Sequence, residues 1–368
     1  MPGHLWGPAL AIRPPRPAAA LAAALFVATA SAWGPDGHHT VGAIADRLIA
    51  GTNAQAQVQA LLGSLTLEQA AVWADCAKGV DPSKNFAYTS PGKYPECAIY
   101  ETPDGEAEMI DFVRRNDTNC PRVPGDESCH EQYHFSDEAI QRKRYHLGDV
   151  GTRDFDVVAA VSATIHVLQG DPAPAPFNIK DKREALLLLA HYVGDIHQPL
   201  HVGAVYLDTA GDVVDPAQGT FDPATATQGG NEITTIHVAT NRKSENFHAT
   251  WDDIPEALQS SHIDATWLAL ARKVPPSRGP IQGWSTTWAS GTLTQARAAV
   301  DGLAFGPQAK GLWTVPLTGR YDDAMAPIKK RQLTEAGARL AQTLEAIWPQ
   351  PGAGRQSALP VHALHVER

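Results

Sequence analysis

The chain has 368 residues, of which 43% are hydrophobic and 19% are charged, and its formal net charge at pH 7 is −10. A chain of this length and composition can bury a full core, so we expect a globular protein with one large or two small domains rather than a disordered chain. The acidic balance argues against a protein that tracks duplex nucleic acid with a basic stripe.

The first 32 residues differ in kind from the rest. Arg13 and Arg16 precede an apolar run, and the small residues at 30–32 are those that a signal peptidase prefers. We therefore predict that residues 1–32 are a signal peptide, that Trp33 is the mature N-terminus, and that the protein is exported to the periplasm or secreted. A membrane anchor is the alternative, but the apolar run is shorter than the roughly 20 residues that span a bilayer.

The cysteines are consistent with export. They number four and include no Cys-x-x-Cys pair, so two disulfides in an oxidising compartment suit them better than a thiolate metal site. Three pairings are possible for Cys76, Cys97, Cys120 and Cys129. Proximity in the sequence favours Cys120 with Cys129, which leaves Cys76 with Cys97, but proximity alone does not decide between the three.

Helical periodicity dominates the chain after Trp33. It is clearest in four segments, at 41–48, 157–168, 183–196 and 324–348. A turn-rich run over 208–230 is expected to hold a hairpin or a long loop. Strand patterns are sparse, and the period is lost over 350–368. We therefore expect an all-α, mainly helical domain over 33–349, followed by a loose C-terminal tail.

Two segments carry histidine and aspartate four residues apart. His191 and Asp195 lie in HYVGDIHQPLH, and His248 and Asp252 lie in NFHATWDD. Residues four apart share a helix face, and the proline of the first motif ends its helix and turns His201 back. Imidazole and carboxylate groups are zinc ligands. One such pair is more often a hydrogen-bonded core or surface feature, but two pairs together with His201 favour a metal site.

Further motifs extend this pattern. WGPDGH begins at Trp33 and contains His38, AAVWADC contains Asp75, YHFSD contains His134, and GGN stands at 229–231. In their order along the chain, these motifs resemble the S1/P1 nucleases, a family of secreted, zinc-dependent, single-strand-specific nucleases. The resemblance covers nearly all of the chain from Trp33 onward. It implies a single compact helical domain with a trinuclear zinc cleft, similar to the fold of zinc phospholipases C.

The resemblance also implies a ligand set for three Zn²⁺ ions per chain. One ion is expected at Asp75, His134, His191 and Asp195. A second is expected at the amino group and carbonyl of Trp33, at His38 and at a shared Asp195. The third is expected at His201, His248 and Asp252. A water between two such ions would be largely hydroxide at neutral pH, and this hydroxide is the expected nucleophile, so no side-chain nucleophile is needed.

Substrate contacts are implied by residues next to the ligands. Phe135 would stack an unpaired base, Asp137 would accept hydrogen bonds from the base edge, and Asn231 belongs to the same substrate-binding set. From the residue alone, ordinary core packing explains Phe135 equally well.

The residue expected to hold the phosphate of the substrate departs from the family pattern. Three residues after the aspartate of the WAD motif the family usually has an arginine, but this chain has Lys78. Lysine keeps the positive charge and loses the bidentate fork of arginine. The expected catalytic residues are therefore Asp75, Asp195 and Lys78.

The predicted function is an exported endonuclease that cleaves single-stranded DNA and RNA to 5′-phosphorylated products, with 3′-nucleotidase activity as a further expectation. We expect no stable protein partner and no membrane association. One alternative is a phospholipase C-like phosphodiesterase, although the spacing from Trp33 to His38, and Asp252 in place of a glutamate, favour the nuclease. The second alternative is a non-catalytic zinc-binding export protein, which would have no use for a base-stacking ring.

Overall fold

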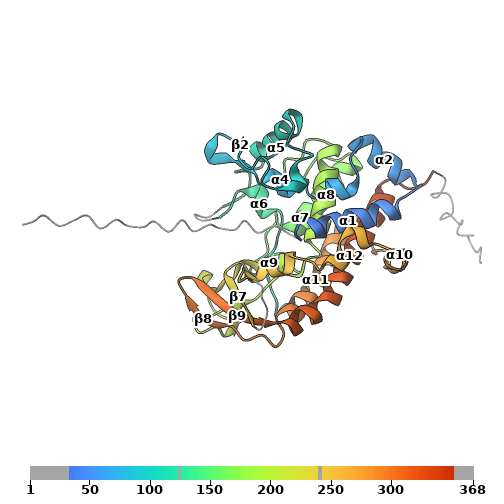
Figure 1. The fold of residues 1–368 in the computed structure, drawn as a ribbon. Helices are drawn as coiled ribbons and strands as arrows, with labels where there is room; N and C mark the ends of the chain where they lie inside the picture. The colour runs from blue at the N-terminus through green and yellow to red at the C-terminus, as the bar shows by residue number, and fades with distance from the viewer. Residues whose placement is uncertain (1–32, 123–125, 239–242, 352–368) are drawn as a thin grey trace, which may run out of the picture.

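The computed structural model describes residues 33–122, 126–238 and 243–351 (Figure 1). Helices are the main elements, and the strands are few and mostly short. The expected signal peptide over 1–32 lies outside the described residues, as does the expected tail from residue 352 onward.

Four long helices form the centre of the molecule: α1 (Pro35–Leu48), α7 (Val157–Gln169), α8 (Lys182–Asp195) and α12 (Gly319–Ile347). They correspond to the four segments with the clearest helical period, and the prediction of a mainly helical fold is confirmed. Helix α1 packs along α12, and α7 packs along α8. Helix α8 is buried without interruption from Glu184 to Asp195, so the side chains of this stretch point into protein rather than solvent.

The ends of α7 and α8 follow from local sequence. Asp156 accepts hydrogen bonds from the amides of Val158 and Ala159 at the start of α7, and Asp181 accepts one from the amide of Glu184 at the start of α8. These caps satisfy amides that have no partner within the helix. After α8 the chain turns into the short 3-10 helix η3 (Pro199–His201), which begins at the proline expected to redirect the chain.

Shorter helices surround this centre. They are α2 (Asn53–Leu62), α3 (Leu67–Ala70), α4 (Trp73–Ala77), α5 (Pro103–Arg115), α6 (Cys129–Gln132), α9 (Phe247–Asp252), α10 (Ala265–Ala271) and α11 (Trp284–Val300). None of the described helices is long and apolar enough to cross a membrane.

The largest sheet has three strands, in the order β7 (Ile233–Val238), β9 (Leu312–Thr318) and β8 (Gly306–Ala309). It lies at the opposite end of the molecule from α5 and β2 (Figure 1). The sequence analysis did not anticipate this sheet, although β9 alternates and buries Trp313, Val315 and Leu317. Three pairs of two-residue strands complete the fold: β1 (Val80–Asp81) with β2 (Ala87–Tyr88), β3 (Glu138–Ala139) with β4 (Gly203–Ala204), and β5 (Tyr206–Leu207) with β6 (Val213–Val214).

The turn-rich segment over 208–230 holds both of the expected structures. The hairpin of β5 and β6 spans its start, and irregular chain with the 3-10 turns η4 (Pro223–Thr225) and η5 (Gln228–Gly230) follows.

Two disulfides link the chain. Cys76 is bonded to Cys97 and Cys120 to Cys129, the pairing that sequence proximity favoured. The first bond joins α4 to the 3-10 turn η2 (Pro95–Cys97), so the segment between them is a covalently closed loop.

Candidate metal centre

The fold gathers eight of the nine residues that the sequence analysis proposed as ligands, and the ninth, Trp33, is buried next to His38. They come from the start of the described chain and α1, from α4, from the segment after α6, from α8 and η3, and from α9. Three groups have side-chain donor atoms within 4.8 Å of one another: His38 with Asp75 and His191, His134 with His191 and Asp195, and His201 with His248 and Asp252.

Asp195 joins the first two groups. Its Oδ1 lies 3.3 Å from Nε2 of His38. Its Oδ2 lies 3.0 Å from Nδ1 of His134 and 3.2 Å from Nε2 of His191. The two oxygens of one buried carboxylate therefore face different histidines, which is the arrangement that a ligand shared by two ions requires.

Asp75 reaches the same place from α4. Its Oδ1 lies 3.6 Å from Nε2 of His191, 3.8 Å from Nδ1 of His134 and 2.8 Å from Nζ of Lys78. Burial alone would raise the pKa of the Asp75 carboxyl, but the ammonium of Lys78 and the nearby imidazoles outweigh burial and hold that pKa well below its usual range. Lys78 is thus placed at the edge of the cluster.

Trp33 and His38 each pack closely against a glycine, Trp33 against Gly37 and His38 against Gly194. Trp33 is fully buried. A Cβ atom at Gly37 would lie 2.7 Å from Cβ of Trp33, and one at Gly194 would lie 2.7 Å from Nδ1 of His38. Any side chain at these positions would displace the tryptophan or the imidazole.

The third group contains two imidazoles whose proton positions are fixed by the backbone. Nδ1 of His201 lies 2.7 Å from the carbonyl oxygen of His134, and Nδ1 of His248 lies 2.9 Å from that of Gly229. Because a carbonyl oxygen can only accept, both Nδ1 atoms carry the proton, and in the neutral rings both Nε2 atoms carry a lone pair. These Nε2 atoms are 2.8 Å apart, a repulsive contact unless a cation binds both.

Burial keeps these imidazoles in the neutral form that binds metal. It lowers the pKa of His191 and of His248 to about 4, and that of His134 and His201 well below the usual value. Burial also raises the pKa of Asp195 to about 7, and the contacts with His38 and the charge of Lys78 compensate only part of this effect. Neutral imidazole nitrogens beside costly buried carboxylates are the donor set that zinc prefers, so the residues present fit this metal.

A cleft of about 430 Å³ borders the third group at His248 and contains the three proposed substrate residues, Phe135, Asp137 and Asn231. The half-buried side chain of Phe135 lines this cleft rather than lying inside the core. Oδ1 of Asp137 and Oδ1 of Asn231 are buried and have no hydrogen-bond partner among the described residues. The cleft therefore combines an aromatic face with two buried oxygen atoms able to accept hydrogen bonds.

A family comparison identifies the class of protein. The model of the S1/P1 nuclease family matches residues 33–349. The chain belongs to the S1/P1 nuclease family.

Curated relatives support this membership along most of their lengths. The chain is 26% identical to Endonuclease 4 of Arabidopsis thaliana, over 90% of this chain and 91% of that protein. It is also 26% identical to Nuclease S1 of Aspergillus oryzae, over 87% and 93% of the two chains, and 25% identical to Nuclease P1 of Penicillium citrinum, over 86% and 97%. S1/P1 nucleases are phosphodiester hydrolases, so the prediction of an enzyme of this class is confirmed.

One histidine of the HYVGDIHQPLH motif of this S1/P1 nuclease takes no part in the cluster. Nδ1 of the buried His197 donates to the carbonyl oxygen of Val193, 2.7 Å away, and Nε2 accepts from the guanidinium of Arg339 at 2.6 Å. Both ring nitrogens are therefore satisfied by α8 and α12, and His197 links these helices.

The sequence analysis missed a residue that orients a ligand. Nε2 of Gln198 donates to Oδ1 of Asp252 at 2.7 Å, which leaves Oδ2 facing Nε2 of His248 at 3.6 Å. Such contacts fix the direction of a carboxylate ligand. The signal available was the position of Gln198 inside the HYVGDIHQPLH motif, three residues from both Asp195 and His201.

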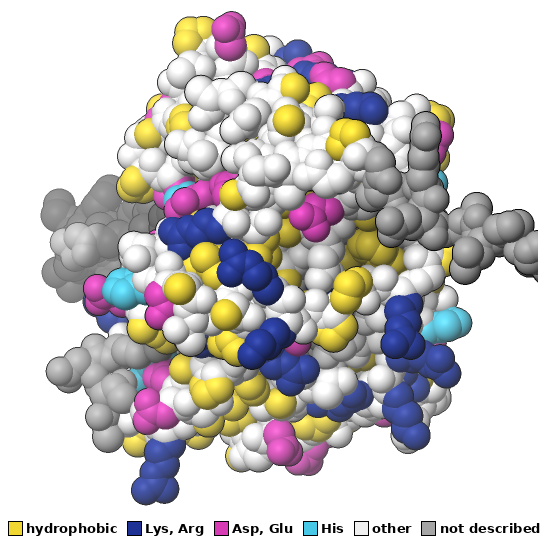
Figure 2. Space-filling model, turned by 90° about the vertical axis from the view of Figure 1, so that its right-hand side faces the viewer, with side chains coloured by type: hydrophobic (Ala, Val, Ile, Leu, Met, Phe, Trp, Pro, Cys, Tyr) yellow, Lys and Arg dark blue, Asp and Glu magenta, His cyan; other side chains and the backbone are white. Residues whose placement is uncertain are grey.

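Charged side chains of both signs lie on the surface of the molecule (Figure 2). On the face shown in Figure 2, the Lys and Arg side chains of the described residues form separate groups, with acidic and apolar side chains between them. On this face the basic groups are interrupted by uncharged and apolar side chains.

Proposed function

We propose that this S1/P1 nuclease is an exported, zinc-dependent endonuclease that hydrolyses single-stranded DNA and RNA to 5′-phosphorylated products and also removes 3′-phosphates from nucleotides. The observation that carries the proposal is the 2.8 Å contact between the Nε2 atoms of His201 and His248. The backbone carbonyls fix both lone pairs in this contact, and a bound cation is the state that relieves it.

We assign three Zn²⁺ ions to the residues that the family resemblance implies. These are Trp33, His38, Asp75, His134, His191, Asp195, His201, His248 and Asp252. The two-sided contacts of Asp195 support its role as the shared ligand. The amino group of Trp33 becomes available as a ligand once the signal peptide over 1–32 is removed.

Zinc bound at these sites would supply an acidified water as the nucleophile and would polarise the phosphate. The chain supplies the remaining contributions. Asp195 orients the histidines of two groups, and Gln198 orients Asp252. The ammonium of Lys78, held at the cluster by Asp75, is placed to bind a non-bridging phosphate oxygen.

The cleft at Phe135 supports the preference for single strands. The ring offers a face for stacking one base, and Asp137 and Asn231 offer acceptors for the donors on its edge. A base inside a duplex can reach neither, because its faces and its pairing edge are already occupied.

The test measures zinc content and hydrolysis together. We expect about three zinc ions per exported chain and much faster cleavage of heat-denatured DNA than of duplex DNA. The variant His201→Ala should lose zinc and activity, whereas His146→Ala, which changes a histidine with an exposed side chain outside the cluster, should retain both. Full activity with less than one zinc per chain, or in His201→Ala, would refute the proposal.

A further inference from the structure

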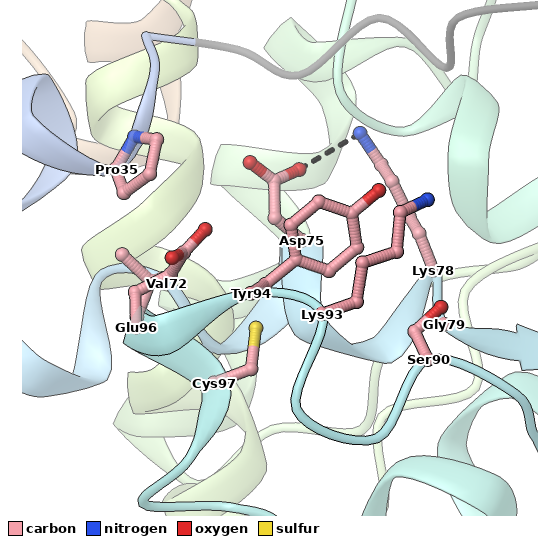
Figure 3. A pocket seen from close by; sticks show the side chains of 10 residues that line it. All are labelled: Pro35, Val72, Asp75, Lys78, Gly79, Ser90, Lys93, Tyr94, Glu96 and Cys97. Atoms are coloured by element: carbon pink, nitrogen blue, oxygen red, sulfur yellow. Dashed lines mark ion pairs between the residues drawn. The ribbon is translucent and has the colours of Figure 1, made fainter.

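A second cleft, of about 320 Å³, borders the metal centre at Asp75 and shares no lining residue with the cleft at Phe135 (Figure 3). Its walls come from α1, from α4 and from the loop that the Cys76–Cys97 disulfide closes. Two separate clefts therefore meet the same cluster, one at Asp75 and the other at His248.

The lining of this second cleft suits a nucleotide. Tyr94 is 37% exposed, and Nζ of Lys93 lies 4.7 Å from the centroid of its ring. Lys78 adds a second ammonium group next to Asp75, and Figure 3 shows the three side chains in one view with that carboxylate. An aromatic face with ammonium groups beside it is the combination by which proteins bind single-stranded nucleic acid.

The charge of this cleft does not repel phosphate. Its two carboxylates, those of Asp75 and Glu96, are matched by the ammonium groups of Lys78 and Lys93. The negative charge of Asp75 is also directed at the imidazoles of the cluster.

The loop that carries Tyr94 is fixed before substrate arrives. The amide of Gly92 donates to both carboxylate oxygens of Glu101, at 2.8 and 3.0 Å, and the hydroxyl of Tyr88 donates to the same carboxylate. The amide of Cys97 donates to the carbonyl of Tyr94 at 3.0 Å. The disulfide then ties Cys97 to the residue that follows Asp75, so the distance between the ring and the metal centre is set by covalent and hydrogen-bonded links.

We propose that this second cleft binds the nucleotide on the other side of the scissile phosphate from the base held at Phe135, with Tyr94 as its stacking platform. The inference rests on the proposed function and adds a substrate subsite to it. Lys93 contacts the phosphate or sugar of that nucleotide, and the scissile phosphate lies between the clefts at the cluster. The enzyme therefore recognises two consecutive unstacked nucleotides.

The experiment compares two phosphodiesters, a thymidine dinucleotide and thymidine 3′-methylphosphate, which lacks the second nucleoside. In Tyr94→Ala, we expect kcat/KM for the dinucleotide to fall by roughly five- to a hundredfold, mainly through KM, which is the usual contribution of one stacked base. The kcat/KM for thymidine 3′-methylphosphate should fall much less. The ratio of kcat/KM for the dinucleotide to kcat/KM for thymidine 3′-methylphosphate should therefore fall. Tyr94→Phe keeps the ring and should stay within about twofold of the wild type.

Two controls separate the possible outcomes. The first is Ile99→Ala, at a 41% exposed residue that does not line the cleft, which should leave kcat/KM for both substrates unchanged. The second is the zinc content, measured for every variant. If Tyr94→Ala left the ratio of the two kcat/KM values unchanged, whether or not both values fell, the second subsite would be overturned and the nuclease proposal would stay intact. A wild-type enzyme that cleaves neither substrate would instead refute the proposed function.

Discussion

Asp195 is the residue on which the metal centre depends most directly. Each of its oxygens faces a different set of imidazoles. The neutral amide of Asp195→Asn offers one oxygen and a nitrogen that cannot bind a cation while it carries both protons. We therefore expect hydrolysis to fall by orders of magnitude, with at least one zinc lost per chain. The measurement is the rate on denatured DNA together with metal analysis.

The control for this variant is Asp171→Asn, at a 63% exposed carboxylate outside the cluster, which should behave as the wild type. Most of the activity surviving in Asp195→Asn, with two or more zinc ions bound, would show that the carboxylate is not shared.

Phe135 is the residue that tests base stacking. Its ring lines the cleft at His248 and is not part of the three histidine and aspartate groups that could hold metal. Phe135→Ala should weaken the binding of single-stranded substrates by about 1–3 kcal/mol, the contribution of one stacked base, while zinc content stays unchanged. Steady-state kinetics on an oligonucleotide provide the measurement, and an unchanged KM would assign the ring to packing alone.

At the scale of elements, α8 positions ligands by being buried on every side. Gly194 lies between two of them, and a Cβ there would come within 2.7 Å of Nδ1 of His38. Gly194→Ala should therefore displace His38 and destabilise the protein by about 1–3 kcal/mol. It should also lower both zinc content and activity. Thermal unfolding and metal analysis measure the two effects.

A second glycine inside a helix is the matched control. An added Cβ at Gly291 in α11 would meet no atom within 4 Å. Gly291→Ala should therefore leave activity unchanged and stabilise the protein by up to about 1 kcal/mol. If both variants unfolded at the same temperature as the wild type, the close approach of His38 to α8 would not constrain position 194.

The elements that could be predicted from the sequence are those whose signal is local. Helices such as α7 and α8 repeat apolar residues at helical spacing, and each histidine and aspartate pair lies within one turn of helix. The three-stranded sheet was missed because β7 pairs with β9, whose residues lie 80 positions further along the chain, as in the pair Ile233 and Trp313. The cleft at Tyr94 was also missed, since its position depends on the disulfide and on Glu101 rather than on any pattern around Tyr94.

For the whole molecule, the metal centre is a junction of distant segments. The amide of Gly34 donates to the carbonyl of Asp252 at 2.9 Å, so the first and last proposed ligands in the sequence lie side by side. Ions bound at the proposed ligands would connect α1, α4, α8 and α9. Metal binding should therefore contribute to the stability of the entire fold, because unfolded chains lack such a site.

The N-terminus provides the test at this scale. An α-amino group has a pKa of about 8 and can bind zinc once it loses its proton. A protein made with one extra residue before Trp33 should fold and keep the ion at His201, His248 and Asp252. It should lose the ion at His38, and hydrolysis should fall by orders of magnitude. The comparison is with the exported protein, by metal analysis and by rate, and equal zinc content and equal rates in the two would remove Trp33 from the ligand set.

If Trp33 is the N-terminal ligand that we propose, the release of its amino group decides when the enzyme becomes active. While residues 1–32 remained attached, the nitrogen of Trp33 would be an amide and could not act as the proposed ligand, so the precursor would hold an incomplete centre. Removal of the signal peptide would then be an activating cleavage, comparable to the maturation of a zymogen. Newly made chains would spare the RNA of the cell that synthesises them, and hydrolysis would begin only on the far side of the membrane.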